Sequence, residues 1–224
     1  MKKSLLALVA ITTLFFGACK KDSNKPGDSN NNGGGGDTYQ PFTTGSVWKY
    51  RSTFLGGEAP ELDTTISTMT DKTKTFENKK FHIVNSTDGT ENYEEYLGLN
   101  DHVYSTYMYD AGLGESIEFA YLNDSKAKGD SWVVAKTYET EEGNIDAQIK
   151  TTIVEKGINK TILDKQYSNV IQTKVEVQYK VQNNWVTLTS IDFYAAKGVG
   201  VIGIYSSIQG ELTFKSELFN YTIK

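Results

Sequence analysis

The sequence predicts an all-β fold, built as one large curled antiparallel sheet in the form of a half-barrel, a barrel or a sandwich. The 14 tyrosines and 10 phenylalanines, together with many Val, Ile and Thr residues, favour strands. All three prolines (Pro26, Pro41 and Pro60) lie in the first 60 residues, so the rest of the chain can form uninterrupted ladders. From about Thr38 onward, apolar and polar residues alternate and turns recur at about 10-residue intervals, which predicts about 11–13 strands.

Residues 1–18 have the organisation of a bacterial lipoprotein signal peptide. Lys2 and Lys3 precede an apolar run from Leu5 to Phe16, which is too short for a stable membrane-spanning helix. Two small residues then precede Cys19, the only cysteine of the chain. This stretch resembles a lipobox, although Phe16 stands where leucine is usual. The resemblance implies that Cys19 is the lipidation site, with palmitate among its acyl chains; an ordinary secretion signal and a retained membrane helix are the alternatives.

Residues 19–37 are predicted to form the lipidated cysteine and a disordered, Gly- and Asn-rich tether. The polar, low-complexity composition cannot bury enough apolar surface to offset the entropy of ordering. Lys20 follows the cysteine in place of the aspartate that, in similar lipoproteins, favours inner-membrane retention. The run "KKDSNK" resembles the charged export tags of some Gram-negative lineages. We therefore expect a lipid-anchored outer-membrane protein that faces the periplasm or the cell surface.

The strands are expected within a single β domain that spans residues 38–224. In chain order, they are Val47–Phe54, Leu62–Thr70, Phe81–Asn85, Tyr93–Leu99, His102–Tyr109, Ile117–Leu122, Trp132–Tyr138, 148–155, Thr161–Leu163, 174–182, 185–195, Val199–Ser206 and Leu212–Ile223. The run "KVEVQYKVQ" shows the clearest alternation, since Val175, Val177, Tyr179 and Val181 share one face.

Two finer features are predicted from the same alternation. The pair Asn183-Asn184 separates two strands and predicts a two-residue hairpin turn. The apolar parity changes between Leu188 and Ile191, which predicts a β-bulge near Thr189–Ser190.

An internal repeat is possible between residues 45–110 and 129–207. "GSVW" at Gly45 and "GDSW" at Gly129 both begin predicted strands, and two looser matches follow them in the same order. Two similar β-meander halves within one sheet would explain this order. Coincidence among the Gly, Thr and aromatic residues of an ordinary β protein is the alternative.

The two ends of the predicted domain carry motifs of a known group of proteins. "PFTTGSVWKY" from Pro41 to Tyr50 contains G-x-x-W-x-Y, and "YAAKGVGVI" from Tyr194 to Ile202 contains Y-x-x-K-G-V-G. The order of these motifs resembles uncharacterised outer-membrane lipoproteins of Gram-negative bacteria. The resemblance implies the fold of residues 40–224 and no established activity.

Gly198, Gly200 and Gly203 spell G-x-G-x-x-G but do not predict a dinucleotide site. Such a site needs a helix after the glycines and an acidic residue about 20 positions further on. The residues that follow are β-branched and aromatic, and the chain ends at Lys224. We expect a glycine-bearing strand against which an aromatic residue such as Trp48 or Trp132 packs.

The remaining inventory predicts no catalytic residue, no cofactor and no metal site. One cysteine and two histidines, His82 and His102, do not have metal-ligand spacing, and we expect each histidine to be an exposed or capped residue at a strand end. Glu94 and Glu95 are adjacent, so they point to opposite faces of a strand and do not form a catalytic pair. The formal net charge of −5, without a basic patch, argues against nucleic acid.

These observations leave three functions open. The leading hypothesis is a non-catalytic binding or accessory module, held at the membrane by its lipid, with an unknown glycan, lipid or protein partner. The second is a carrier of a hydrophobic or lipid ligand in a half-barrel. The third is a glycan-acting enzyme. Six tyrosines between residues 93 and 121 are expected to be mostly core, or else a recognition surface.

Overall fold

Twelve strands make up the described part of the computed structural model, which covers residues 36–57, 59–110, 115–140 and 143–224. They are β1 (Val47–Phe54), β2 (Glu61–Phe76), β3 (Lys79–Thr87), β4 (Asn92–Asn100), β5 (Val103–Asp110), β6 (Glu115–Asn123), β7 (Ser131–Thr140), β8 (Gly143–Ile162), β9 (Lys165–Val181), β10 (Asn184–Ala196), β11 (Gly200–Ile208) and β12 (Glu211–Thr222). The predicted all-β class is confirmed. Within the described ranges, no helix is long and apolar enough to cross a membrane.

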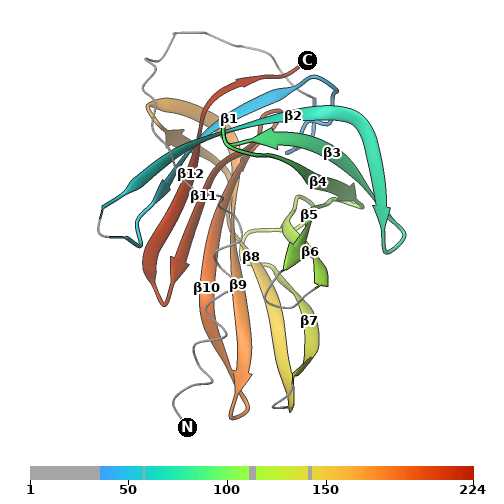
Figure 1. The fold of residues 1–224 in the computed structure, drawn as a ribbon, viewed down its shortest axis with the longest axis vertical. Coiled ribbons are helices and arrows are strands. Elements are labelled where there is room, and N and C mark those ends of the chain that lie inside the picture. Colours follow the sequence, from blue (N-terminus) through green and yellow to red (C-terminus); the bar gives the residue numbers. More distant parts are fainter. Residues whose placement is uncertain (1–35, 58, 111–114, 141–142) are drawn as a thin grey trace.

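All twelve strands belong to one antiparallel sheet that stays open. Its order is β6-β5-β4-β3-β2-β1-β12-β11-β10-β9-β8-β7, so β1 pairs with β12 at the centre and β6 and β7 are the edges. The sheet curls over itself, which gives the half-barrel alternative (Figure 1). The strands β1–β6 form one side and β7–β12 the other; their origin in a sequence repeat stays a prediction.

Tight turns with positive φ connect the long hairpins. The pairs Glu77–Asn78, Asp101–His102, Leu163–Asp164 and Gln182–Asn183 all adopt left-handed backbone conformations, which match the twist of antiparallel strands. The predicted turn at Asn183-Asn184 is therefore wrong by one residue, because Gln182 takes the first position and Asn184 already begins β10.

Bulges bend the longest strands, and because of them a predicted short strand and a predicted bulge site differ from the structure. β8 shifts register three times along its 20 residues, so it runs on to Ile162 and absorbs the short strand predicted at Thr161–Leu163. The bulge in β10 lies between Thr187 and Thr189, slightly before the predicted site. Since each bulge adds a residue to one strand and increases its twist, these shifts help the sheet to curl.

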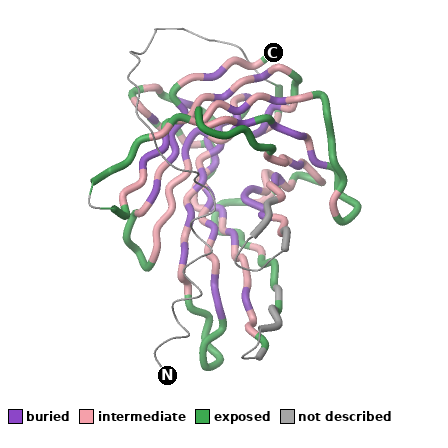
Figure 2. The backbone as a smooth tube through the Cα atoms, viewed as in Figure 1, coloured by how far each residue is buried: buried purple, intermediate pink, exposed green. Residues whose placement is uncertain are grey.

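One core group fills the concave side of the sheet under β8–β10. The hairpin of β5 and β6 folds inward and packs against these strands, in a predominantly apolar group that includes Phe119, Tyr121, Ile171, Val175 and Phe193 (Figures 1 and 2). The ring of Tyr121 stacks on that of Phe193 at a centroid distance of 5.2 Å. This half of the concave face is therefore solid core.

The inner side of β6 is capped by side chains instead of a neighbouring strand. Thr151 Oγ1 on β8 donates to the carbonyl of Ala120 over 3.0 Å, and Thr173 Oγ1 on β9 donates to that of Tyr121 over 2.7 Å. Lys156 Nζ likewise donates to the carbonyls of Asp124 and Lys126. These bonds satisfy backbone acceptors that an edge strand leaves unpaired.

The glycine-rich stretch forms a turn and the start of a strand. Gly198 has φ 75° in the turn before β11, and Gly200 has φ 109° at its first residue. A Cβ on Gly200 would lie 3.2 Å from Trp48 Nε1, which donates to the carbonyl of Val199. Trp48 is thus the aromatic partner, as expected, and no helix follows the glycines.

A separate aromatic cluster covers the outer face of the hairpin of β2 and β3. The rings of Phe76 and Tyr107 stack at 4.0 Å, and Phe81 lies fully buried beside them. Gly98 leaves room for this packing, because a Cβ there would lie 2.8 Å from Phe81 Cε1. The tyrosines between 93 and 121 therefore divide: Tyr104 and Tyr121 are core, whereas Tyr93 is exposed.

Candidate functional site

The residues singled out in the sequence do not gather at one place. Cys19 lies outside the described residues. His82 is in the middle of β3 and its ring packs on Phe42 at 4.6 Å, so the expected exposed strand end is wrong for this histidine. The pKa of His82 is lowered, mainly by burial and to a smaller extent by the positive charge of Lys80. His102 is exposed in a turn, as expected.

Residues 38–46, which precede β1, form a strap across one end of the half-barrel. Gly198 donates its amide to the carbonyl of Thr38 over 2.8 Å, while Tyr39 donates its amide to the hydroxyl of Tyr104 over 3.1 Å. Further along, Gly45 donates its amide to the carbonyl of Met69 on β2, and Met69 donates its amide to the carbonyl of Ser46. The hydroxyl of Ser46 accepts from the amide of Lys224. The strap therefore ties the turn between β10 and β11 to β5 and β2.

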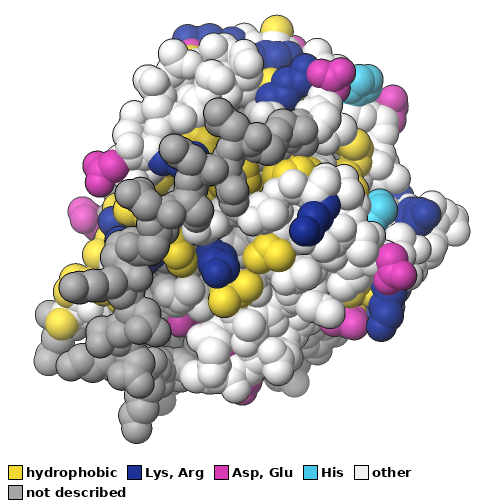
Figure 3. All heavy atoms as spheres, turned by 90° about the horizontal axis from the view of Figure 1, so that it is seen from above, with side chains coloured by type: hydrophobic (Ala, Val, Ile, Leu, Met, Phe, Trp, Pro, Cys, Tyr) yellow, Lys and Arg dark blue, Asp and Glu magenta, His cyan; other side chains and the backbone are white. Residues whose placement is uncertain are grey.

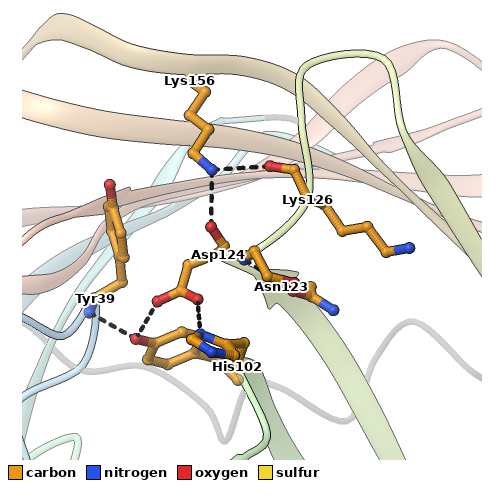
Figure 4. A network of polar contacts seen from close by, with 8 residues as sticks. Tyr39, His102, Asn123, Asp124, Lys126 and Lys156 are labelled. Carbon is orange, nitrogen blue, oxygen red and sulfur yellow. Dashed lines mark hydrogen bonds and ion pairs between the residues drawn. The ribbon is translucent and has the colours of Figure 1, made fainter.

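A polar network around Asp124 holds the strap, and Figure 4 shows Tyr39 of the strap and His102 beside that carboxylate. Tyr104 donates its hydroxyl to Asp124 Oδ2 over 2.9 Å, and Asp124 Oδ1 lies 2.7 Å from His102 Nδ1. Burial is the main cause of a raised pKa for Tyr104. Every polar atom that faces the centre of this network has a partner among the others, so we interpret it as a structural latch.

A second polar group lies on the concave face of β1–β4, away from the packed half. Cross-strand pairing places Ser52 opposite Asp63, and Ser67 opposite Ser86. The group, named the Glu95 site, consists of Tyr50, Ser52, Asp63, Thr65, Ser67, Ser86, Tyr93 and Glu95. All eight share the face of Met69 and Val84, which pack in the core, so the site faces the inside of the curl.

Glu95 is the most buried carboxyl of this group. Ser86 Oγ lies 2.9 Å from Glu95 Oε2 and 2.8 Å from Ser67 Oγ. Burial raises the pKa of Glu95, and the hydroxyls of Ser86 and Ser67 oppose that rise. A carboxyl that is costly to ionise and remains partly accessible is a frequent property of binding and catalytic sites.

Tyr93 stands at the accessible margin of the Glu95 site with 37% of its surface exposed. Burial raises its pKa to about 12, with Glu95 as the next cause and smaller contributions from Asp88 and Asp63; Thr65 opposes the rise. Asp88 lies in the turn between β3 and β4, where Thr90 and Glu91 bind its Oδ1. Tyr93 is thus a neutral aromatic ring surrounded by carboxylates.

Tyr50 forms the inner wall of the site. Its hydroxyl donates to the carbonyl of Val201 over 2.9 Å, and burial, with Glu95 as the next cause, raises its pKa well above the ordinary value. Two cations of the surrounding strands lie on the other face, Arg51 over Phe219 and Lys74 over Phe76, whereas Lys80 shares the concave face at the far end of β3, beside His82. Among the described residues, no Lys or Arg pairs with Glu95 or Asp63.

A groove of about 500 Å³ adjoins the Glu95 site and shares Ser86 and Tyr93 with it. Its other lining residues alternate with those of the site and so point to the opposite face: Ile66, Thr68, Asn85, Thr87, Asn92 and Glu94. The groove is open and holds one carboxylate, which accepts a hydrogen bond from Tyr96. Tyr93 therefore borders both the Glu95 site on the concave face and the groove on the opposite face.

Other surfaces of the described chain offer weaker candidates. Seen from above, hydrophobic side chains surface in the middle of the molecule, and Lys and Arg side chains gather along one edge (Figure 3). In the part of the chain that the structure describes, no three metal-ligating side chains lie close enough to hold an ion.

Comparisons with known proteins locate two solved structures that resemble this chain. One is a protein assigned as exported, with a YmcC-like fold, from Bacteroides fragilis: 10% identity, 80% of this chain and 96% of that one covered, TM-score 0.44. The other is a protein assigned as a lipoprotein, from Parabacteroides distasonis: 12% identity, 82% and 98% covered, TM-score 0.48. No family model and no curated protein matches the chain.

Sequence reasoning missed the Glu95 site because its members are ordinary strand residues. The adjacency of Glu94 and Glu95 predicts that they lie on opposite faces, and the structure confirms this, but adjacency alone does not indicate which face is the inner one. The available signal was Tyr93 and Glu95 at a spacing of two, since such residues share a face. Their encounter with Ser67 and Asp63 depends on register, which the sequence does not display.

Proposed function

We propose that the protein is a lipid-anchored, non-catalytic binding module of the bacterial outer membrane, and that the Glu95 site holds a small ligand. The single observation that carries this proposal is the combination of an exposed Tyr93 with a partly accessible Glu95 on the concave face. Binding sites commonly join an aromatic surface to a few well-placed polar groups.

A carrier of a lipid chain fits the interior less well. An acyl chain needs a continuous apolar space, whereas the apolar half of the concave face is occupied by Phe119 and Tyr121 of β6. The accessible half presents hydroxyls and carboxylates, which lose hydration without compensation against a hydrocarbon.

A glycan-acting enzyme is the second candidate, favoured by one observation. Burial raises the pKa of both Asp63 and Glu95, and the two side chains share the concave face. A glycosidase needs its two carboxyl groups about 5–9.5 Å apart, whereas the register sets Glu95 level with Met69, six positions along β2 from Asp63, so this candidate is the weaker one. Release of reducing sugar from envelope glycans, lost in both Glu95→Gln and Asp63→Asn, would replace the binding proposal with this one.

A ligand screen on the purified mature protein tests the binding role. Saccharides, amino acids, amines and organic acids would be added to isotope-labelled protein, and the NMR signals of β2–β4 followed. We expect at least one class to shift the signals of Tyr93 and Glu95, with binding lost in Glu95→Gln and kept in Glu94→Gln. A screen in which no class perturbs these strands contradicts the proposal.

The anchor is tested separately by metabolic labelling with a palmitate analogue. We expect the label on the wild-type chain and its absence from Cys19→Ser, with the wild-type protein in the outer-membrane fraction. Protease treatment of intact cells then separates the cell-surface orientation from the periplasmic one. Equal labelling of the two chains contradicts lipidation at Cys19.

A further inference from the structure

We infer that the Glu95 site recognises a cation, namely a ligand that carries a protonated amine or a guanidinium group. This inference rests on the proposed binding role and adds the chemical class of the ligand. It follows from three features of the site: an excess of negative charge, free acceptor positions, and neutral tyrosine rings beside them.

The acidic side chains of the site come from β2, from β4 and from the turn before β4, and each carries a negative charge when it is ionised. Glu95 on β4 and Asp63 on β2 share the concave face, and Asp88 stands at the turn beside Tyr93. Lys74 is held over the outer rings of Phe76 and Tyr96, and Lys80, which shares the concave face, lies six positions along β3 from Ser86 and beside His82. A phosphate or carboxylate ligand would meet like charges, whereas a cation supplies the missing countercharge.

The hydrogen-bonding groups of the site are mainly acceptors. A carboxylate has about four acceptor positions, and the hydroxyls of Ser86 and Ser67 account for at most two on Glu95. The Ser86 hydroxyl has a single proton and lies within hydrogen-bonding distance of both Glu95 Oε2 and Ser67 Oγ, so this proton is used within the group and is not offered to a ligand. Such a site matches an ammonium or guanidinium group, which only donates.

Tyrosine rings complete the site for a cation. Tyr93 is partly exposed, and both it and Tyr50 have raised pKa values, so the rings stay neutral. The face of a neutral phenol attracts an amine cation, and the attraction is larger where carboxylates lie beside it. Because the described residues offer no cluster of three metal ligands, an organic cation fits better than a metal ion.

The test uses three probes of matched length: 1,5-diaminopentane, 1,5-pentanediol and glutarate. Calorimetric or NMR titration of the mature protein should give binding of the diamine, at least about 10-fold weaker binding of the diol, and none of glutarate. Glu95→Gln should weaken diamine binding about 10-fold. Glu94→Gln, which removes the adjacent charge on the opposite face, should leave it unchanged.

The pH dependence gives a second readout. Besides Glu95, the titratable groups that face the site are Asp63, Asp88, Tyr50 with its neighbours Tyr121 and Tyr167, Tyr93 and, further along β3, His82 and Lys80. The diamine stays protonated below neutral pH, so a loss of affinity on acidification reports the acids. Since the pKa values of Glu95 and Asp63 are raised, these two should protonate before Asp88, whose pKa is lowered.

Equal affinities for diamine and diol, a preference for glutarate, or no diamine binding would each overturn the inference. These outcomes leave the binding role itself intact when the broader screen finds another ligand that depends on Glu95. If that screen also finds none, the proposed function fails together with its charge preference.

Discussion

The two halves of the concave face use the same antiparallel sheet for opposite purposes. Under β8–β10, the side chains of β6 fill the interior with Phe119 and Tyr121, and threonine hydroxyls cap the edge of β6. Under β1–β4, Trp48, Met69 and Val84 pack in a second core group, and beside them small hydroxyl residues line the face and Tyr93 and Glu95 remain partly accessible. One half stabilises the fold, and the other presents chemistry.

The contrast shows how one open sheet can be stable and still keep a surface on which a ligand can bind. Buried aromatic rings contribute most of the burial energy available to such a fold. Ser52, Ser67 and Ser86 contribute little burial energy because their side chains are small, and they leave space for Glu95 on the same face. Substitutions should therefore have large effects on stability in the packed half and small ones at the polar positions of the other half.

The largest effect is expected for Phe193→Ala in the packed half. Phe193 is 8% exposed and packs on Tyr121 and Phe119, so its removal leaves a cavity that the two sides of the curl cannot close. The free energy of unfolding, measured with urea, should fall by about 3–4 kcal/mol.

Leu62→Ala is the matched control, because Leu62 is 69% exposed. Its unfolding free energy should stay within about 0.5 kcal/mol of the wild type. A loss below about 1 kcal/mol for Phe193→Ala would mean that the hairpin of β5 and β6 does not pack as described.

The next effect is expected at the capped edge of β6. The double variant Thr151→Val and Thr173→Val keeps the shape of both side chains and removes the donors to the carbonyls of Ala120 and Tyr121. Two buried acceptors without partners should cost about 2–4 kcal/mol together. Amide hydrogen exchange in β6 should also become faster than in the wild type.

Thr161→Val on the same β8 strand is the control, since Thr161 is exposed and its side-chain hydroxyl makes no hydrogen bond within the described residues. Unchanged exchange of β6 in the double variant would show that the two hydroxyls do not hold this edge.

A smaller effect is expected for Tyr104→Phe in the latch. The hydroxyl links the amide of Tyr39 to Asp124, so its loss should cost about 1–2 kcal/mol and accelerate hydrogen exchange at the Tyr39 amide. Tyr194→Phe, whose hydroxyl has no partner in the described chain, should change neither quantity. If Tyr39 exchanges at the wild-type rate in Tyr104→Phe, the strap is held by its other contacts.

The fold could be predicted from the sequence because period-two alternation is a local property. β1 matches its predicted bounds, and β12 differs by one residue at each end, since both strands alternate without interruption. β8 could not be delimited, because three bulges break its alternation and make its second half read as a separate strand. Bulges follow the curvature of the sheet, which long-range packing determines.

The candidate site could not be predicted because it depends on register between strands. Asp63 and Glu95 lie 32 positions apart and share a face through two intervening pairings. A shift of one residue in either pairing would send one carboxyl to the opposite face. The inward position of His82 was missed for the same reason, since its partner Phe42 belongs to the strap.

The smallest effect expected is the change in unfolding free energy when Glu95 ionises. The sign of this change shows whether Glu95 acts as a structural group, like the packed half, or as an uncompensated charge. Since burial raises the pKa of Glu95, the folded protein holds this proton more tightly than the unfolded chain does. Stability should therefore fall as the pH rises from the ordinary glutamate value, about 4.3, through the raised folded value, and stay lower above it. Glu95→Gln lacks this titration, so it should be the more stable protein at neutral pH and equal to the wild type in acid.

Urea unfolding of Glu95→Gln across that pH range, with Glu94→Gln as the control, checks the sign. The control should track the wild type within about 0.5 kcal/mol at every pH, because Glu94 is exposed on the opposite face. A wild type that is more stable than Glu95→Gln at neutral pH would mean that the carboxylate is already compensated within the fold. Glu95 would then belong with the packed half as a structural group, and a cationic ligand would have no unpaired charge to neutralise.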